Sequence, residues 1–251
     1  MRALLTSLLC VTALLTAPAY AGNLTVFAAA STVQVLDEIR DHWDPENKTR
    51  LRIVYGSSGA LARQIDAGAP ADIYFSANSH WVDHLAQQKR IRPDTRLTVF
   101  RNRIVLVAPA TAQLPTPFSL QTGIAAALGP DGRLAIGDPQ HVPAGIYARQ
   151  ALGGLGLWAQ LSHRTVRTQN VRLALALVQR GEARLGIVYY TDAIQTGQVR
   201  IVATIDGSLH APIDYQAVAT NTAGPAADRL LAYLASDAGR TIYRKFGFLT
   251  R

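Results

Sequence analysis

The stretch LRIVYGSSGALARQI, residues 51–65, decides the fold class of this 251-residue chain. It passes from a β-branched apolar run, through the turn GSSG, into a segment whose apolar residues have helical spacing. A strand followed at once by a helix is the repeating unit of α/β proteins. Two adjacent serines, Ser57 and Ser58, occupy the turn, and their role depends on the rest of the chain.

The same alternation runs along the chain on both sides of this unit. β-rich apolar runs predict strands at residues 23–29, 51–55, 71–77, 97–100, 103–109, 133–139, 185–190, 199–205 and 213–220. Helical spacing and helix-ending residues predict helices at 31–43, 59–67, 80–88, 144–152, 171–180, 226–234 and 239–246. The predicted fold class is α/β: two lobes, each a mostly parallel sheet flanked by helices, with a ligand in the cleft between them.

Two pairs of neighbouring strands are candidates for the crossings between the lobes. The runs at 97–100 and 103–109 are almost continuous and form the first pair. The runs at 199–205 and 213–220 form the second pair, of which the run at 213–220 is the candidate return. We therefore expect lobe I to comprise residues 22–101 plus 213–251, and lobe II to comprise residues 102–212. The hinge is expected near residues 97–103 and 213–220.

The first 21 residues have the features of a cleaved secretory signal. Arg2 precedes an apolar run at 3–17, and AYA at 19–21 is a typical cleavage site. The run is shorter than the about 20 residues that a membrane-spanning helix needs. Cys10, the one cysteine, lies inside this segment after two leucines, which disfavours a lipoprotein. The expected mature chain starts at residue 22, is exported and soluble, and has no thiol for a disulfide or a metal.

The chain is basic, with a formal net charge of +8, or +7 once Arg2 is removed. Its densest basic cluster, KRIRPDTR at 89–96, lacks interleaved aromatic residues. Export and this scattered charge argue against a nucleic-acid partner. The charge can help attract an anion, but only by steering it.

Four predicted helix starts leave backbone amides available for a ligand. The first amides of a helix have no intrahelical partner, and the N-terminus carries roughly half a positive charge. Four such ends aimed at one point would sum to about +2, enough to balance a dianion without Lys or Arg. The alternative is that these are ordinary caps on separate helices. The starts are Ser31, with Gln34 completing a capping box; Ser58, at the end of the GSSG turn; Ala144, after Pro143; and Val171, after the candidate cap Asn170.

Other chemistries fit the sequence less well. A serine nucleophile at Ser57 or Ser58 would need a base, GSSG is not the G-x-S-x-G motif, and His141 lies in no recognisable triad motif. His80 and His84 share a helical face and could bind a metal, but no acidic residue completes the set.

Tyr189 and Tyr190 end the apolar run at 185–190, where a predicted strand meets the cleft. One phenol could donate a hydrogen bond to an anion, and two phenolates could bind ferric ion. Aromatic packing at the end of the strand is the third interpretation, and the residues alone leave all three open.

Taken together, five stretches resemble the periplasmic molybdate-binding proteins of bacterial molybdate ABC importers. The resemblance covers essentially all of the expected mature chain, in order. The stretches are VFAAAS, YGSSGALARQIDAGAPADIYFSA, GDPQHVPAGIYARQAL, NVRLALALVQRGEARLGIVYYTDA and YRKFGF.

The resemblance implies a two-lobed periplasmic-binding-protein fold of type II that closes on a tetrahedral oxyanion. In that family the ligand accepts hydrogen bonds from two serines, two further amides and one tyrosine. On this chain they match Ser31, Ser58, the amides of Ala144 and Val171, and Tyr189. Tyr190 stands where relatives often carry a smaller residue.

The implied function is capture of molybdate, and of tungstate too, for an inner-membrane ABC permease and its ATPase. The protein would act in the periplasm as a monomer, without catalytic activity, cofactor or metal beyond the molybdenum of its ligand. Neutral donors suit a fully deprotonated oxyanion, and selection against sulfate would depend on cavity size. The alternatives are a ferric-ion binding protein that uses Tyr189 and Tyr190, and a secreted serine hydrolase.

Overall fold

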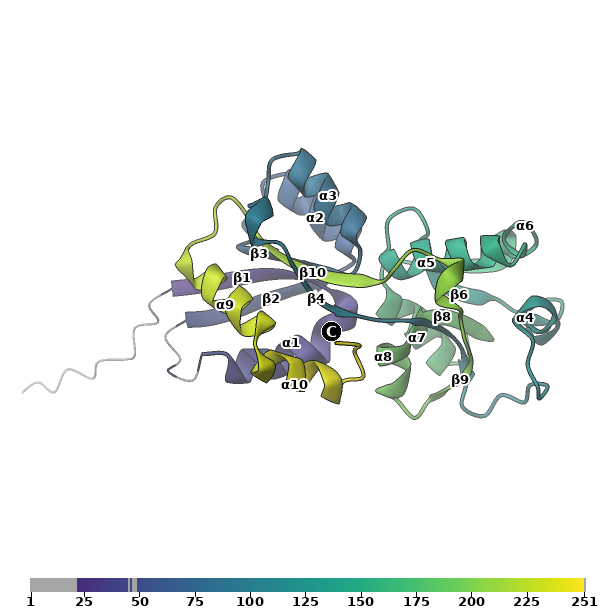
Figure 1. The fold of residues 1–251 in the computed structure, drawn as a ribbon. Coiled ribbons are helices and arrows are strands. Elements are labelled where there is room, and N and C mark those ends of the chain that lie inside the picture. The colour runs from purple at the N-terminus through teal and green to yellow at the C-terminus, as the bar shows by residue number, and fades with distance from the viewer. Residues whose placement is uncertain (1–21, 45, 47–48, 251) are drawn as a thin grey trace, which may run out of the picture.

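The computed structural model describes residues 22–44, 46 and 49–250. The predicted signal segment and Cys10 lie outside the described residues. Two five-stranded sheets form two lobes that lie side by side (Figure 1). No helix in the described part of the chain is both long and apolar enough to span a membrane. The two-lobed α/β fold predicted from the sequence is confirmed.

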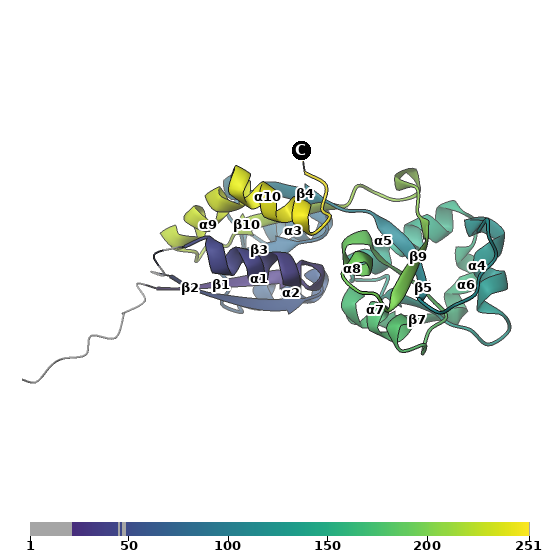
Figure 2. The ribbon, with the colours of Figure 1, turned by 90° about the horizontal axis from the view of Figure 1, so that it is seen from below.

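Lobe I is built on a sheet with strand order β2-β1-β3-β10-β4. Helices α2 and α3 cover one face of this sheet, and α1, α9 and α10 cover the other (Figures 1 and 2). The strands are β1 (Gly22–Ala29), β2 (Thr49–Gly56), β3 (Ile73–Ser76), β4 (Leu97–Arg101) and β10 (Asp214–Ala219). The helices are η1 (Ala30–Thr32), α1 (Val33–His42), α2 (Ser58–Asp66), α3 (Ser79–Gln87), η2 (Pro93–Thr95), α9 (Pro225–Ala235) and α10 (Asp237–Lys245).

Lobe II is built on a sheet with strand order β7-β6-β8-β5-β9, against which α5 and α7 pack. The strands are β5 (Ile104–Pro109), β6 (Leu134–Gly137), β7 (Thr165–Thr168), β8 (Leu185–Tyr189) and β9 (Val199–Thr204). The helices are α4 (Leu120–Leu128), α5 (Pro143–Gly154), α6 (Trp158–Leu161), η3 (Ser162–Arg164), α7 (Val171–Gln179), α8 (Tyr190–Ile194) and η4 (Gly207–Leu209). The sequence prediction omits α4, α6, α8 and β7.

Alternating side chains explain why lobe I needs helices on both faces of its sheet. Phe27 and Tyr74 belong to the core cluster beneath α2 and α3, whereas their neighbours Val26 and Phe75 belong to the cluster on the other face. Successive strand residues point to opposite faces, so a strand that is apolar throughout is buried on both sides.

Both sheets are mixed, and the direction of the crossing strands explains the antiparallel pairs. β1 pairs in parallel with β2 and β3, and β6 pairs in parallel with β7 and β8. β10 and β5 are antiparallel to both of their neighbours. Each of these two is the strand with which the chain enters a lobe after a crossing. It therefore starts at the cleft, where the parallel strands end.

Candidate functional site

A small pocket lies where strands of both lobes end and helices of both lobes begin. This is the edge at which open α/β sheets hold ligands. Within the described part of the chain, the residues that line it include no lysine, arginine, histidine, aspartate or glutamate. They are Ala29, Ala30, Gly56, Ser57, Ala77, Val142, Pro143, Ala144, Asn170, Val171 and Tyr189.

Three helix N-termini meet at this pocket. α2 begins at Ser58, α5 at Pro143 and α7 at Val171. The amides of Ser58, Ala144 and Val171 lie in the first turn of their helices, where a backbone N–H has no intrahelical acceptor. Ala144 and Val171 line the pocket, and so does Ser57, next to Ser58. Of the predicted site residues, Ala144, Val171 and Tyr189 of lobe II line the pocket, whereas from lobe I it is the neighbours of Ser31 and Ser58 that do so.

Ser57, and not Ser58, caps α2. The Ser57 hydroxyl oxygen accepts a hydrogen bond from the Ala60 amide at 3.3 Å. Ser58 is fully buried as the first helical residue, and its hydroxyl oxygen accepts a hydrogen bond from the Ala77 amide at 3.0 Å. A backbone N–H can only donate, so the Ser58 hydroxyl keeps its own proton for another acceptor.

Ser31 does not form the predicted capping box, which is therefore wrong. The turn η1 takes up residues 30–32, α1 starts only at Val33, and no side chain among the described residues caps it. Ser31 instead makes a 2.7 Å hydrogen bond with the Tyr215 hydroxyl, and the Gln34 side chain accepts from Arg172 of lobe II. Ala30, which precedes Ser31, lines the pocket, while the Ser31 side chain borders a neighbouring hollow beside Gln34 and Arg172.

The other two helix starts agree with the sequence prediction. The Asn170 side chain accepts a hydrogen bond from the Leu173 amide at 3.1 Å, as a helix cap does. Pro143 occupies the first position of α5, where its missing N–H costs nothing.

The Tyr189 hydroxyl is a buried donor without a partner. Tyr189 lines the pocket and is 1% exposed, and its hydroxyl has no hydrogen-bond partner in the described part of the chain. Burial raises the pKa of this phenol well above its usual value, and the neighbouring Tyr215 adds to the shift. The group therefore keeps its proton. Leaving such a donor unpaired is costly, so the pocket is suited to a ligand with an acceptor atom.

Tyr190 faces different surroundings and does not line this pocket. The Arg103 guanidinium lies 3.8 Å from the centroid of its ring, a cation–π contact. The Tyr190 amide donates to the Arg103 carbonyl at 2.9 Å. The two phenols therefore do not converge as a pair of ferric ligands. Among residues 22–44, 46 and 49–250, no group of three His, Cys, Asp or Glu could hold a metal ion.

The hydrolase alternative lacks its base. The hydroxyl oxygens of Ser57 and Ser58 both accept from backbone amides, and within the described ranges neither meets an imidazole. His141 lies 3.7 Å from Asp138, with which it shares the turn before α5. Of the two histidines that could bind a metal, His80 and His84, the ring of His84 has its Nε2 atom 4.0 Å from a carboxylate oxygen of Asp66.

The lobes touch through residues that the sequence did not reveal. The Asn78 side chain of lobe I donates to the Tyr147 hydroxyl of α5 at 2.8 Å. A Cβ atom on Gly59 would lie 2.3 Å from the His141 carbonyl, so only glycine permits this approach of α2 to lobe II. These partners lie far apart in the chain, and no local pattern connects them.

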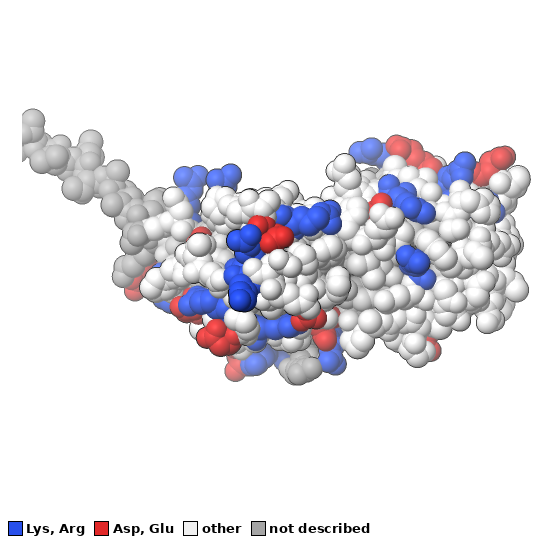
Figure 3. All heavy atoms as spheres, turned by 90° about the horizontal axis from the view of Figure 1, so that it is seen from above, with Lys and Arg blue, Asp and Glu red and all other residues white. Residues whose placement is uncertain are grey.

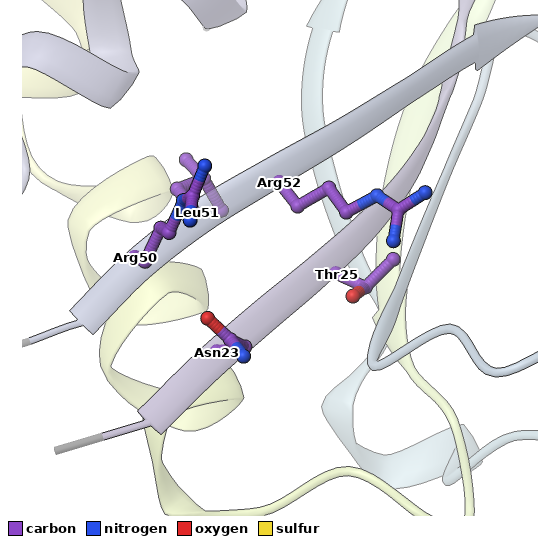
Figure 4. Close-up of a pocket in the computed structure, with 5 residues that line it drawn as sticks. All are labelled: Asn23, Thr25, Arg50, Leu51 and Arg52. Atoms are coloured by element: carbon purple, nitrogen blue, oxygen red, sulfur yellow. The ribbon is translucent and has the colours of Figure 1, made fainter. Parts of the chain in front are cut away.

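Apart from the Arg172–Asp192 pair beside Ser31, charged side chains are spread over the outer surface (Figure 3). Figure 3 shows Lys and Arg interspersed with Asp and Glu over one face of lobe I. A second pocket, lined by Asn23, Thr25, Arg50, Leu51 and Arg52, lies toward the amino ends of β1 and β2, where Arg52 reaches over β1 toward Thr25 (Figure 4). That is the end of the sheet opposite to the one where α/β folds hold ligands.

Comparison with known proteins gives a consistent result. The family model of the bacterial extracellular solute-binding proteins matches residues 24–249. The chain is 41% identical over 229 residues to the molybdate-binding protein ModA of Escherichia coli, covering 90% of this chain and 89% of the relative. It is 38% identical to ModA of Haemophilus influenzae, covering 92% and 91%. The structure of the Azotobacter vinelandii periplasmic molybdate-binding protein matches with a TM-score of 0.78 at 26% identity, covering 91% and 99%.

Proposed function

The chain belongs to the bacterial extracellular solute-binding proteins, and from this premise we propose that it binds molybdate between its lobes and delivers it to a membrane ABC importer. The relatives that carry the name molybdate-binding protein span nearly the whole chain, and this supports molybdate as the ligand. Tungstate, a tetrahedral dianion of the same shape, is included in the proposal. The family binds solutes, and no catalytic role is proposed.

The unpartnered Tyr189 hydroxyl carries the proposal. It lies in an uncharged pocket together with Ala144 and Val171, at the N-termini of two helices, and beside the start of α2. Molybdate at neutral pH offers only acceptor oxygens, and each of these groups is a donor. We propose that the ligand set consists of Ser31, Ser58, the amides of Ala144 and Val171, and the Tyr189 hydroxyl.

The neutrality of the pocket also suggests how the ligand is selected. A protonated anion such as monohydrogen phosphate would turn one O–H toward a donor, and a buried polar contact without an acceptor is costly. Sulfate has the same charge and shape as molybdate, so selection against it depends on the larger size of the molybdate ion.

The proposal includes the setting in which the protein works. An extracellular solute-binding protein acts outside the cytoplasm, and the signal features of residues 1–21 support release into the periplasm as a monomer. We propose lobe limits at residues 101/102 and 212/213, with the hinge in the two crossings. The partners would be an inner-membrane permease and its ATPase.

Calorimetric titration of the purified mature chain tests this function. Molybdate and tungstate should bind with one site per chain, while sulfate, phosphate and ferric citrate at equal concentrations should bind far more weakly or not at all. Tighter binding of sulfate, or binding of ferric citrate alone with a coloured product, would reject the proposal.

A further inference from the structure

We propose that Tyr215 and Asn102, both in the segments that cross between the lobes, are positioning residues that make the Ser31 hydroxyl a donor toward the ligand. This inference rests on the proposed function, in which Ser31 donates to the oxyanion. It adds residues that lie behind the ligand set and connects that set to the hinge.

A backbone amide fixes the orientation of the Asn102 side chain. Asn102 lies between β4 and β5, and its side-chain oxygen is 2.9 Å from the Arg103 amide nitrogen. Because a backbone N–H can only donate, the oxygen of the Asn102 amide must be on this side. The Asn102 nitrogen then faces the Thr191 hydroxyl at 2.9 Å and the Tyr215 hydroxyl at 3.4 Å.

The orientation of Asn102 favours one direction for the next hydrogen bond. The Tyr215 oxygen accepts from the Asn102 nitrogen, which leaves the phenol proton for the Ser31 oxygen, 2.7 Å away. The Tyr189 ring also contacts the Tyr215 ring, but within the described residues the Tyr189 hydroxyl makes no hydrogen bond that would compete for this proton. Distance alone would allow either hydroxyl to donate in that pair. Tyr215 is fully buried, and burial, assisted by the charge of Asp192, raises its pKa well above the usual range. The phenol is therefore always protonated.

The Ser31 hydroxyl is the last donor in this series of hydrogen bonds. The Ser31 oxygen accepts from Tyr215, so the Ser31 hydroxyl proton is available to the ligand. The Ser58 hydroxyl proton is also available to the ligand, because the Ser58 oxygen accepts directly from the Ala77 amide. Both serines thus accept one hydrogen bond from the protein and can present their own proton to an oxyanion, which can only accept.

The opposite direction would oppose binding. A Ser31 hydroxyl that donated to Tyr215 would turn its lone pairs toward the bound anion. Asn102 lies on one crossing between the lobes and Tyr215, on β10, lies on the other. The donor direction of Ser31 is therefore set by the two segments about which the lobes are expected to move.

Molybdate titrations of Tyr215→Phe and Ser31→Ala, separately and combined, test this inference. Tyr215→Phe keeps the ring that packs against Phe100 and Phe248 and removes only the hydroxyl. It should weaken molybdate binding about 3- to 10-fold, the effect of losing one hydrogen bond. In the Ser31→Ala background the same substitution should change the affinity by less than about twofold, because its effect passes through Ser31.

Two further variants complete the design. Asn102→Ala removes the hydrogen bond that the Tyr215 oxygen accepts. It should also weaken molybdate binding only when Ser31 is present. This variant provides the test if Tyr215→Phe does not fold. Thr191→Val is the matched control, because it removes the other partner of the Asn102 nitrogen without touching the route to Ser31. It should leave the affinity near that of the wild type.

The outcomes separate this inference from the proposed function. If wild-type protein does not bind molybdate, the function is overturned and this inference with it. If wild-type protein binds and Ser31→Ala weakens binding, but Tyr215→Phe has no effect or an equal effect in both backgrounds, only the positioning role is overturned. Thermal unfolding of each variant shows whether affinity and stability change independently.

Discussion

The Asn78 side chain of lobe I donates a 2.8 Å hydrogen bond to the Tyr147 hydroxyl of lobe II. The same hydroxyl donates to the Ala77 carbonyl at 3.1 Å, so one phenol makes two contacts across the cleft. Ala77 also lines the pocket, and its amide donates to Ser58. Contact between the lobes and the geometry of the pocket therefore share residues.

Tyr147→Phe should weaken molybdate binding by favouring separated lobes. One net hydrogen bond contributes about 0.5–1.5 kcal/mol, which corresponds to about a 2- to 13-fold loss of affinity. Small-angle scattering should show that molybdate makes the wild type more compact, that sulfate at equal concentration does not, and that the variant needs more molybdate for the same change.

Tyr243→Phe is the matched control for this prediction. Tyr243 is equally buried, and its hydroxyl donates to the Leu234 carbonyl within lobe I at 2.7 Å. This variant should lose stability and keep its affinity. Equal affinity losses in the two variants, or no compaction with bound molybdate, would contradict closure of the lobes on the ligand.

Ser31→Ala and Ser58→Ala should each weaken molybdate binding about 10- to 150-fold. A hydrogen bond to a charged group contributes roughly 1.5–3 kcal/mol, and both serines present a proton to the ligand. Ser58→Ala should also destabilise the fold by about 1–3 kcal/mol, because the buried Ala77 amide loses its acceptor. Calorimetry and thermal unfolding measure the two effects separately.

Ser236→Ala provides the comparison for the serine variants. Its hydroxyl oxygen caps α10 by accepting from the Gly239 amide at 3.2 Å, far from the pocket. It should cost about 1 kcal/mol of stability, as caps do, with unchanged affinity. Wild-type affinity in both Ser31→Ala and Ser58→Ala would remove these serines from the ligand set.

Tyr189→Phe and Tyr190→Phe test which phenol contacts the ligand. Both substitutions keep the ring, so the lost hydroxyl is the variable. Tyr189→Phe should lose about 1.5–3 kcal/mol of binding free energy, whereas Tyr190→Phe should stay near the wild type because its ring packs against Arg103. Molybdate titrations decide the point. If only Tyr190→Phe loses affinity for molybdate, Tyr190 and not Tyr189 donates to the ligand. Iron-dependent colour without molybdate binding would favour the ferric alternative.

Local pattern predicted much of the fold because the strands and helices carry their own periodicity. It missed α4, since LQTGIAAAL is apolar on most sides and interrupted by Gly123. It also missed α8, because Tyr190 continues an apolar run that resembles the strand before it. The antiparallel pairs depend on where the chain crosses between lobes, which no single segment reveals.

The site could be predicted where its cues are local, and not where they are distant. Pro143, the first residue of α5, and Asn170, just before α7, mark those helix starts in the sequence itself. The prediction that Ser31 caps a helix is wrong because the Ser31 hydroxyl bonds to that of Tyr215, 184 positions away in the sequence. The Asn78–Tyr147 contact spans 69 positions. Such pairs form only when the two lobes come together.

Asp192 should make stability fall as the pH rises through the weakly acidic range. Burial raises the pKa of this carboxyl from 3.8 to about 6, and the Arg172 guanidinium 2.8 Å away only partly offsets the shift. Between these values the folded protein binds the proton more tightly than the unfolded chain does. The contribution of this group to the free energy of unfolding therefore declines from about pH 4 to about pH 6 and is constant above that range.

Asp192→Asn should remove this part of the pH dependence, measured by thermal unfolding across the same range. Asp237→Asn removes the same charge from a side chain that is 97% exposed and serves as the control. The same pH dependence in the two variants would show that Asp192 is not the group responsible.

The anomalous scattering of molybdenum in a crystal of the molybdate complex would locate the bound ion itself. We predict one strong peak between the lobes, within hydrogen-bonding reach, through its oxygens, of the amides of Ala144 and Val171 and of the Tyr189 hydroxyl. A peak in the pocket beside Arg50 and Arg52 (Figure 4), with none between the lobes, would contradict the account, because an exposed pair of arginines would then hold the anion in place of the neutral donors.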